Sequence, residues 1–358
     1  MHLTDEEIIL EISISRLTFL NFEQKKLLRK NIDSPHKLSL LSKDDIENFT
    51  GKKLSPRVEW NGPENFRMSK VALQRCKMMN IQILLYDDLK YPELLRQTEN
   101  PPYLLFCRGN VELLTNGKSV SVVGTRRITP EGRKSAHNFA YDAAVDGCNV
   151  VSGLANGVDG YAHQGAVDAW FDALEKGYDC NLLGKTIAVL PSAIDEITPV
   201  SHKKMASQIL QTEGLILSEY EPGAMMAKWH FVARNRIIAG LSPATVVIEA
   251  PAGSGALITA DFALDENRDV LFHRAAFNSL AVQVGEAVHN DLEKLHATGK
   301  VSRYKMENCP EKFLEAGAPV INDYKDYCKC LAEMPGTRSN QKNIQKDLFS
   351  EDENLNVR

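Results

Sequence analysis

Residues 119–132 read SVSVVGTRRITPEG and carry three signals that together predict a strand, a turn and a helix. The run SVSVVG is rich in β-branched residues, which favour a buried strand. Gly124 ends this run and allows a close approach of the backbone, whereas Thr129 and Pro130 match a helix N-cap and a first helical residue. A strand that passes through a glycine turn into a helix is the repeating unit of α/β proteins.

The same alternation of short β-branched runs and helical segments continues to residue 273. Strands are predicted at 119–124, 148–153, 185–191, 214–220, 244–250 and 269–273. Several of these runs are apolar at nearly every position, as strands of a parallel sheet covered on both faces should be. We therefore predict an α/β fold with a Rossmann-like, doubly wound, mostly parallel sheet.

The rest of the chain predicts two regions outside this core. Residues 1–80 carry leucines and isoleucines at helical spacing between turn signals, which predicts a small helical N-terminal domain. The core is expected to span residues 81–332. Residues 333–358 are polar and poor in core residues, so a disordered tail is expected there.

The composition excludes several classes of protein. Hydrophobic residues at 43% and charged residues at 25% are typical of a globular chain, and a net charge of -5 argues against a surface that coats nucleic acid as a whole. A local basic groove stays possible. The seven cysteines are scattered without a C-x-x-C pair, so we expect no disulfide framework, no metal and no cofactor. The N-terminus lacks a signal-peptide pattern and no apolar run reaches membrane-spanning length, so a cytoplasmic location is expected.

Ligands of doubly wound sheets bind where loops meet at the carboxyl ends of the strands. Gly124, Arg126 and Arg127 stand in such a loop directly before a predicted helix N-terminus, a combination that favours an anion. A tight turn with two solvated arginines is the alternative. Ser192, after the third core strand, offers a hydroxyl, and the PAGSG turn at 251–255 offers a further anion-binding loop.

A second cluster lies in residues 228–242, which read KWHFVARNRIIAGLS. Lys228 can contact a phosphate. If the segment is extended, the three aromatic side chains that follow alternate in direction, so at least one faces the ligand. The alternative for Phe231 is a core anchor for the helix that follows.

Arg234 and Arg236 flank Asn235 at the predicted start of that helix, where positive charge opposes the helix dipole. These three residues are expected mainly to organise the loop and the helix start, with a secondary role in ligand binding. A carboxylate is expected to pair with one arginine and a bound phosphate with the other. The candidate carboxylates are Glu219, Glu221 and Glu249.

Asp159 and His163 stand four residues apart on the helix predicted after residue 153. The spacing is compatible with acid–base chemistry, but a helix cap and a packed histidine are the commoner interpretation. No residue is assigned to catalysis.

Several of these motifs, in this order and spacing, resemble the DNA-processing protein A family, known as DprA or Smf. They are VVGTRR, VVSGLANGVDGYAH, KTIAVL, LILSEYEPG, FVARNRIIAGLS and VVIEAPAGSGALITADFALDENRDV. The likeness covers about residues 80–273 and resumes at 309–326. A chain of such blocks is far more specific than any single glycine motif.

The resemblance implies a protein that binds single-stranded DNA without sequence specificity, forms a homodimer and helps to load the RecA recombinase in natural transformation, without being an enzyme. It places DNA contacts at Gly124, Thr125, Arg126, Lys228 and Phe231, and also at Ser192. To these we add Arg127, Arg234 and Asn235 as candidate contacts from their position in the same loops. The helical N-terminal part is similar to the sterile-alpha-motif-like domain of that family.

The chain departs from the family pattern in two insertions, near 168–184 and 276–308, and in the HRAAFNS segment that replaces a V-P-G turn. It also resembles, more distantly, phosphoribohydrolases with a P-G-G-x-G-T-x-x-E loop. Here Ala256 takes the place of the threonine and Thr259 that of the catalytic glutamate. A nucleotide-binding sensor therefore remains as the alternative function.

Residues 345–349, which read QKDLF, match a pentapeptide that binds the sliding clamp at four of five positions. Because short motifs recur by chance, this partner is a minor hypothesis.

Overall fold

The computed structural model describes residues 3–333 of the chain. Its centre is a nine-stranded sheet in the order β1-β2-β6-β5-β4-β3-β7-β8-β9. The strands are β1 Gln82–Leu85, β2 Leu104–Gly109, β3 Lys118–Val123, β4 Cys148–Ser152, β5 Thr186–Leu190, β6 Leu215–Ser218, β7 Ala244–Val247, β8 Asp269–His273 and β9 Val320–Ile321. The six strands predicted between residues 119 and 273 are confirmed, although β6 and β7 end two or three residues before their predicted ends.

The sheet is parallel from β6 to β9, and the β1–β2 and β2–β6 pairs at one edge are antiparallel. Every residue of β4, β5, β6 and β7 is buried, which explains why these strands read as continuous apolar runs. From β3 the chain winds outward through β4, β5 and β6, and then returns to place β7 on the other side of β3. The carboxyl ends of β3 and β7 therefore form a topological switch point, where ligands of such sheets bind.

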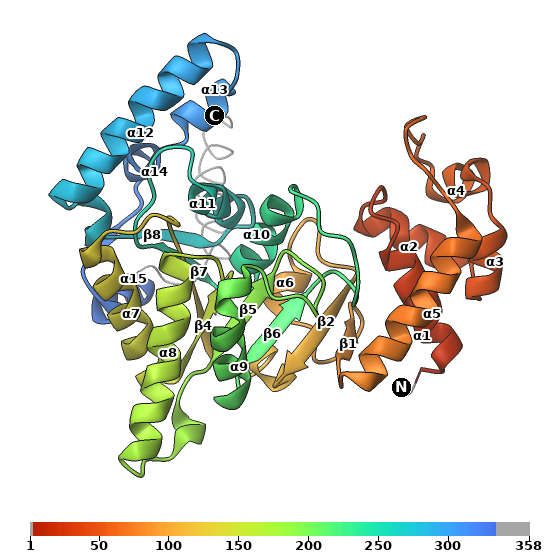
Figure 1. Cartoon of the computed structure of the whole chain (residues 1–358), viewed down its shortest axis with the longest axis horizontal. Helices are drawn as coiled ribbons and strands as arrows, with labels where there is room; N and C mark the ends of the chain where they lie inside the picture. The colour runs from red at the N-terminus through yellow and green to blue at the C-terminus, as the bar shows by residue number, and fades with distance from the viewer. Residues whose placement is uncertain (1–2, 334–358) are drawn as a thin grey trace, which may run out of the picture.

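Helices cover both faces of the sheet, as predicted for a doubly wound fold (Figure 1). On one face, Ala140 of α7 and Ala162 of α8 pack in the same hydrophobic cluster as Val122. On the other face, Ile237 of α10 packs in a cluster with Val123. The covering helices are α6 Glu93–Arg96, α7 Pro130–Val145, α8 Val158–Glu175, α9 Lys203–Gln211, α10 His230–Gly240 and α11 Gly255–Asp265.

The described residues up to 80 form a helical bundle beside β1 and β2 (Figure 1). Its helices are α1 Asp5–Ser15, α2 Phe22–Asn31, α3 Pro35–Leu40, α4 Lys43–Thr50 and α5 Gly62–Met78. Side-chain N-caps at Thr4, Asn21, Ser34, Ser42 and Asn61 begin them. Leu10 and Leu28 share a hydrophobic cluster with Phe106 of β2, so the bundle packs directly on the sheet.

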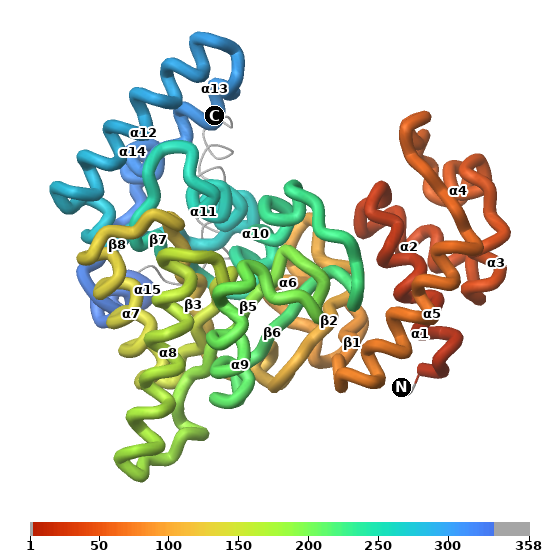
Figure 2. The backbone as a smooth tube through the Cα atoms, viewed as in Figure 1, coloured from red at the N-terminus to blue at the C-terminus, as the bar shows by residue number. Residues whose placement is uncertain are grey.

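The segment after β8 supplies a helical arm. Figure 2 shows this arm, α12 and α13, at the opposite end of the molecule from α1–α5. The C-terminal helices are α12 Ser279–Ala297, α13 Arg303–Glu307, α14 Pro310–Glu315 and α15 Tyr324–Glu333. Short 3-10 turns are η1 Val111–Leu114, η2 Cys180–Leu182, η3 Val200–His202 and η4 Arg274–Phe277. Across residues 3–333, none of the helices combines the length and the apolar character that crossing a membrane requires.

Candidate nucleic-acid interface

Three loops meet directly after β3, at the switch point. The backbone N–H of Thr125 donates to the carbonyl oxygen of Glu249, at 2.6 Å, and its carbonyl oxygen accepts from the N–H of Val158, at 3.2 Å. A Cβ atom on Gly124 would lie 2.3 Å from Cγ2 of Val158 and 2.7 Å from the carbonyl oxygen of Glu249. Glycine is required here because the loops after β3, β4 and β7 leave no space for a side chain.

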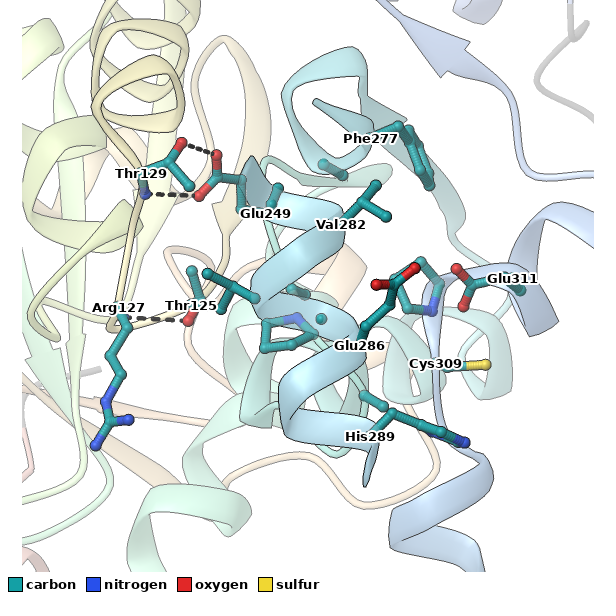
Figure 3. Close-up of a pocket in the computed structure, with 18 of the residues that line it drawn as sticks. Thr125, Arg127, Thr129, Glu249, Phe277, Val282, Glu286, His289, Cys309 and Glu311 are labelled. Atoms are coloured by element: carbon teal, nitrogen blue, oxygen red, sulfur yellow. Dashed lines mark hydrogen bonds between the residues drawn. The ribbon is translucent and has the colours of Figure 1, made fainter. Parts of the chain in front are cut away.

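The turn that follows is held by polar contacts, as the Thr-Pro pair predicts. Thr129 is the N-cap of α7 and accepts from the N–H of Gly132, at 3.1 Å, with Pro130 as the first helical residue. Its own N–H and hydroxyl donate to the carboxylate of Glu249, at 2.9 and 2.5 Å (Figure 3). Glu249 therefore fixes this turn and is not the partner of an arginine.

Arg126 and Arg127 project from this fixed turn into solvent. The N–H of Arg127 donates to Oγ1 of Thr125, at 3.1 Å, and Figure 3 shows its guanidinium pointing away from Glu249. In the described part of the chain, neither guanidinium has a carboxylate within ion-pair distance. The turn thus presents two arginines without acidic partners beside a helix N-terminus, where an anion is favoured.

Phe231 reaches the same place from another part of the chain. The guanidinium carbon of Arg126 lies 5.1 Å from the centre of the Phe231 ring, within cation–π distance. The ring is only partly buried and belongs to none of the core clusters, so it is not a core anchor of α10. Lys228 is exposed three residues before it. We call Arg126, Lys228 and Phe231 the strand site.

The segment at 228–231 is not extended, so the alternation considered for an extended segment does not apply. Trp229 has helical dihedral angles, φ -70° and ψ -20°, and α10 begins at His230. His230 is buried and stacks on Tyr220, with ring centres 3.9 Å apart, while Trp229 meets His230 edge-on. Burial lowers the pKa of His230. This aromatic stack begins the helix, so its residues follow the helical period rather than alternating.

The arginines of α10 lie in the interior. Arg234 is 4% exposed, and its Nη1 donates to the carbonyl oxygens of Gly153, at 2.7 Å, and Val189, at 2.5 Å. Burial lowers the pKa of Arg234 to about 10, with the charge of Asp159 acting in the opposite direction. A Cβ on Gly153 would lie 2.0 Å from the guanidinium, so this glycine makes room for it. Arg234 therefore joins the loop after β4 to the end of β5, in keeping with the mainly organising role expected from the sequence.

The neighbours of Arg234 have structural partners too. Arg236 pairs with Glu219 at 2.7 Å, which confirms that one carboxylate neutralises one arginine. Asn235, 8% exposed, donates from Nδ2 to the carbonyl oxygen of Gly255, at 3.2 Å. The remaining candidate carboxylate, Glu221, pairs with Arg16 of the helical bundle.

Ser192 is also enclosed. It is fully buried, its hydroxyl donates to the carbonyl oxygen of Glu196, at 2.6 Å, and its carbonyl oxygen accepts from the hydroxyl of Ser218, at 2.6 Å. These contacts shape the loop after β5. A DNA contact at Ser192, like those at Arg234 and Asn235, remains a prediction.

Asp159 and His163 have structural surroundings. The sequence predicts Asp159 as the N-cap of α8, but Gly157, with φ 84°, holds that position. Asp159 instead accepts a hydrogen bond from the N–H of Ala155, at 3.3 Å. His163 is fully buried, accepts from the N–H of Leu154, at 3.2 Å, and contacts Thr186 through Nδ1, at 2.6 Å. Burial lowers the pKa of His163 to about 3, which keeps its ring neutral.

The loop after β7 differs from the anion-binding turn expected at 251–255. The N–H of Gly253 donates to the carbonyl oxygen of Asn308, at 2.8 Å, and is therefore already occupied. A pocket of about 520 Å³ between this loop and α12 is lined by three carboxylates, Glu249, Glu286 and Glu311, against one arginine, Arg127, and one histidine, His289 (Figure 3). The excess of carboxylates disfavours a phosphate. Thr259 is buried and donates to the carbonyl oxygen of Gly255, at 3.3 Å. Within residues 3–333, no group of three or more metal-ligating side chains is assembled.

Comparison with known proteins identifies a family. Residues 82–331 match the sequence model of the family described as DNA recombination-mediator protein A. The chain is 37% identical over 229 residues to protein Smf of Synechocystis sp., which covers 63% of this chain and 53% of that protein. It is 30% identical over 267 residues to protein Smf of Borreliella burgdorferi, covering 74% and 78% of the two chains. The DNA processing protein DprA of Bacillus subtilis is 34% identical over 228 residues, with 64% of this chain and 67% of that protein covered.

Two solved structures share the fold over much of the chain. The structure of DNA processing protein A from Streptococcus pneumoniae superimposes with a TM-score of 0.60 and 29% identity, covering 92% of this chain and 98% of that one. DNA processing protein A from Helicobacter pylori gives a TM-score of 0.52 and 25% identity, covering 71% and 97%. That structure is described in terms of its single-stranded DNA binding mode.

Proposed function

The chain belongs to the DNA recombination-mediator protein A family, and from this membership and the strand site we propose that it binds single-stranded DNA without sequence preference. The observation that carries the proposal is the Arg126 guanidinium over the ring of Phe231, 5.1 Å from its centre, at the switch point of the sheet. A strand offers a phosphate and a base in each unit. An arginine without an acidic partner suits the first and an aromatic face suits the second.

Lys228 extends this surface with one more cation. Phosphate contacts by lysine and arginine release counterions, and an aromatic ring stacks on any base, so both kinds of contact tolerate every sequence. The net charge of -5 keeps the rest of the surface from adding much non-specific attraction. Binding is therefore proposed to be local, salt-dependent and insensitive to sequence.

Removing Lys228 tests the electrostatic part. Lys228→Ala is expected to flatten the plot of log affinity for oligo-dT against log salt by about 0.7, because one phosphate contact on a single strand is lost. If the two proteins bind equally at 1 M salt, this change of slope over one decade of salt concentration lowers the affinity of the variant at 0.1 M salt on the order of fivefold. Fluorescence anisotropy across a salt series measures both quantities. Lys300→Ala, which removes an exposed lysine from the α12–α13 arm, is the matched control. Equal slopes in the two variants would contradict a phosphate contact at Lys228.

We further propose that the bound strand is handed to a recombinase of the RecA type, that the protein acts as a homodimer, and that it binds without a catalytic step. The proposal rests on family membership. Thr259 stands where the phosphoribohydrolases carry their catalytic glutamate, and this supports binding of the strand without hydrolysis. The clamp-binding motif predicted at 345–349 lies outside the described residues and stays a prediction.

Loading of RecA has a direct test. On DNA already coated with single-strand-binding protein, the wild-type chain is expected to shorten the lag before RecA hydrolyses ATP. A variant with Phe231→Leu is expected to shorten the lag less than the wild-type chain at the same protein concentration, because it holds the strand more weakly. If the wild-type chain binds the strand and still leaves the lag as it is, strand binding stands and the loading proposal fails.

A further inference from the structure

A second pocket, of about 630 Å³, is lined by Arg126 but not by Phe231. Several helices contribute to its walls: Arg133 lies on the first turn of α7, Tyr161 on the first turn of α8, Met205 on α9, and Leu280 and Val284 at the start of α12. Its volume lies in the range of about 300 to 1,000 Å³ that is usual for small-ligand sites. Because Arg126 belongs to both, this pocket is continuous with the strand site.

The charge of this pocket has one sign. Arg126, Arg127 and Arg133 line it, and within the described segment no aspartate or glutamate does. All three arginines are exposed, and none has a carboxylate within ion-pair distance among residues 3–333. The N-termini of α7 and α8 add their partial positive charges at the same place. In a chain of net charge -5, such a concentration of cations favours an anion with more than one charge.

The side chains repeat the pattern of the strand site. The guanidinium carbon of Arg133 lies 5.8 Å from the centre of the Tyr161 ring, as that of Arg126 lies 5.1 Å from Phe231. Tyr161 is partly buried, and its hydroxyl has no hydrogen-bond partner among the described residues. In the sequence, Arg127 lies between Arg126 and Arg133, the arginines of the two pairs. Two arginine–aromatic pairs on one continuous surface match two successive phosphate-and-base units of a polymer better than they match a single small anion.

From this arrangement we propose that the pocket is a second subsite for the same single strand, a proposal that rests on the proposed function. Arg127 and Arg133 contact phosphates, and Tyr161 stacks against a base. Leu280 and Val284, from within the segment 276–308, form its apolar wall. The insertion therefore takes part in binding the strand.

The test compares two neighbouring cations on α7. Arg133→Gln removes a charge that lines the pocket, whereas Lys134→Gln removes an exposed charge from the same helix outside the pocket. With oligo-dT of about 16 nucleotides, Arg133→Gln is expected to flatten the salt slope by about 0.7 and to weaken binding about fivefold at 0.1 M salt. Lys134→Gln is expected to keep the wild-type slope. Equal thermal unfolding of the variants and the wild type serves as the folding control.

A second measurement locates the base without relying on affinity. Oligo-dT that carries 5-iodouracil is irradiated on the wild-type chain, and the crosslinked peptides are identified by mass spectrometry. Crosslinks are expected at the peptide that contains Tyr161 as well as at the one that contains Phe231, and Tyr161→Leu is expected to remove the first and keep the second.

The outcomes separate the two proposals. If the wild-type chain binds oligo-dT but Arg133→Gln keeps its affinity and slope and no crosslink forms at Tyr161, the second subsite is refuted and the strand site stands. If Arg133→Gln weakens binding of thymidine monophosphate but not of oligo-dT, the pocket holds a small anion and the proposal is equally refuted. If the wild-type chain does not bind oligo-dT at all, the proposed function itself fails.

Discussion

Replacing Phe231 with leucine is expected to lower the affinity for oligo-dT between about fivefold and 150-fold, because stacking a base on an aromatic ring contributes about 1 to 3 kcal/mol. The ring is only partly buried and lies beside Arg126, with the guanidinium carbon 5.1 Å from its centre. Leucine keeps the apolar volume and removes the π-face. Fluorescence anisotropy with labelled oligo-dT measures the loss.

Two controls separate stacking from other effects of this substitution. Phe231→Tyr keeps an aromatic face and is expected to bind within about threefold of the wild-type chain, since stacking tolerates ring substituents. Oligo-dC is expected to respond as oligo-dT does. Wild-type affinity in Phe231→Leu would show that the ring does not touch the strand. A loss confined to one base would show direct readout in place of stacking.

Replacing Arg234 with methionine is expected to lower the free energy of unfolding by about 3 to 5 kcal/mol, the usual cost of removing one partner from a buried charged network. The substitution leaves the carbonyl oxygens of Gly153 and Val189 without their Arg234 donor, and it removes the positive charge that most opposes the raised pKa of the buried Asp159. Equilibrium unfolding in urea, followed by circular dichroism, measures the change. Arg127→Met, at an exposed position, is expected to stay within about 0.5 kcal/mol of the wild-type chain.

The reason for that loss has its own test. Burial already raises the pKa of Asp159, and Arg234 opposes this shift. Without the arginine, the carboxylate is a buried charge with less compensation, so adding Asp159→Asn to Arg234→Met is expected to recover part of the lost stability. An additive loss in the double variant would show that the carbonyl contacts alone account for the effect. If Arg234→Met alone is as stable as the wild-type chain, Arg234 does not stabilise the fold.

Much of the architecture follows from local sequence. The six core strands were predictable because the signal for a buried strand, a run of apolar β-branched residues, lies entirely within each strand. The cap at Thr129 was predictable for the same reason, since its hydroxyl reaches an N–H three residues away. The start of α10 was not predictable, because the Trp229–His230–Tyr220 stack that begins it joins residues from two sides of a loop.

The candidate site shows the same division. Arg126 and Phe231 were both named from the sequence, but their contact was not, because 231 and 126 meet only through the winding of the sheet. Arg133 and Tyr161 were not named. A signal existed, since Arg133 stands four residues after the Thr129 cap and therefore on the same side of α7, but only the fold brings Tyr161 to it.

By itself, the sequence determined the doubly wound class, the glycine turn after β3 and the kinds of side chain that could meet a strand. Tertiary structure alone decided which arginines meet it. Arg126 in the turn after β3 and Arg234 in α10 carry the same charge, yet one is exposed beside an aromatic ring and the other is enclosed and donates to two carbonyl oxygens. Local patterns depend on residues a few positions apart, whereas burial depends on contacts between segments that only the completed fold brings together.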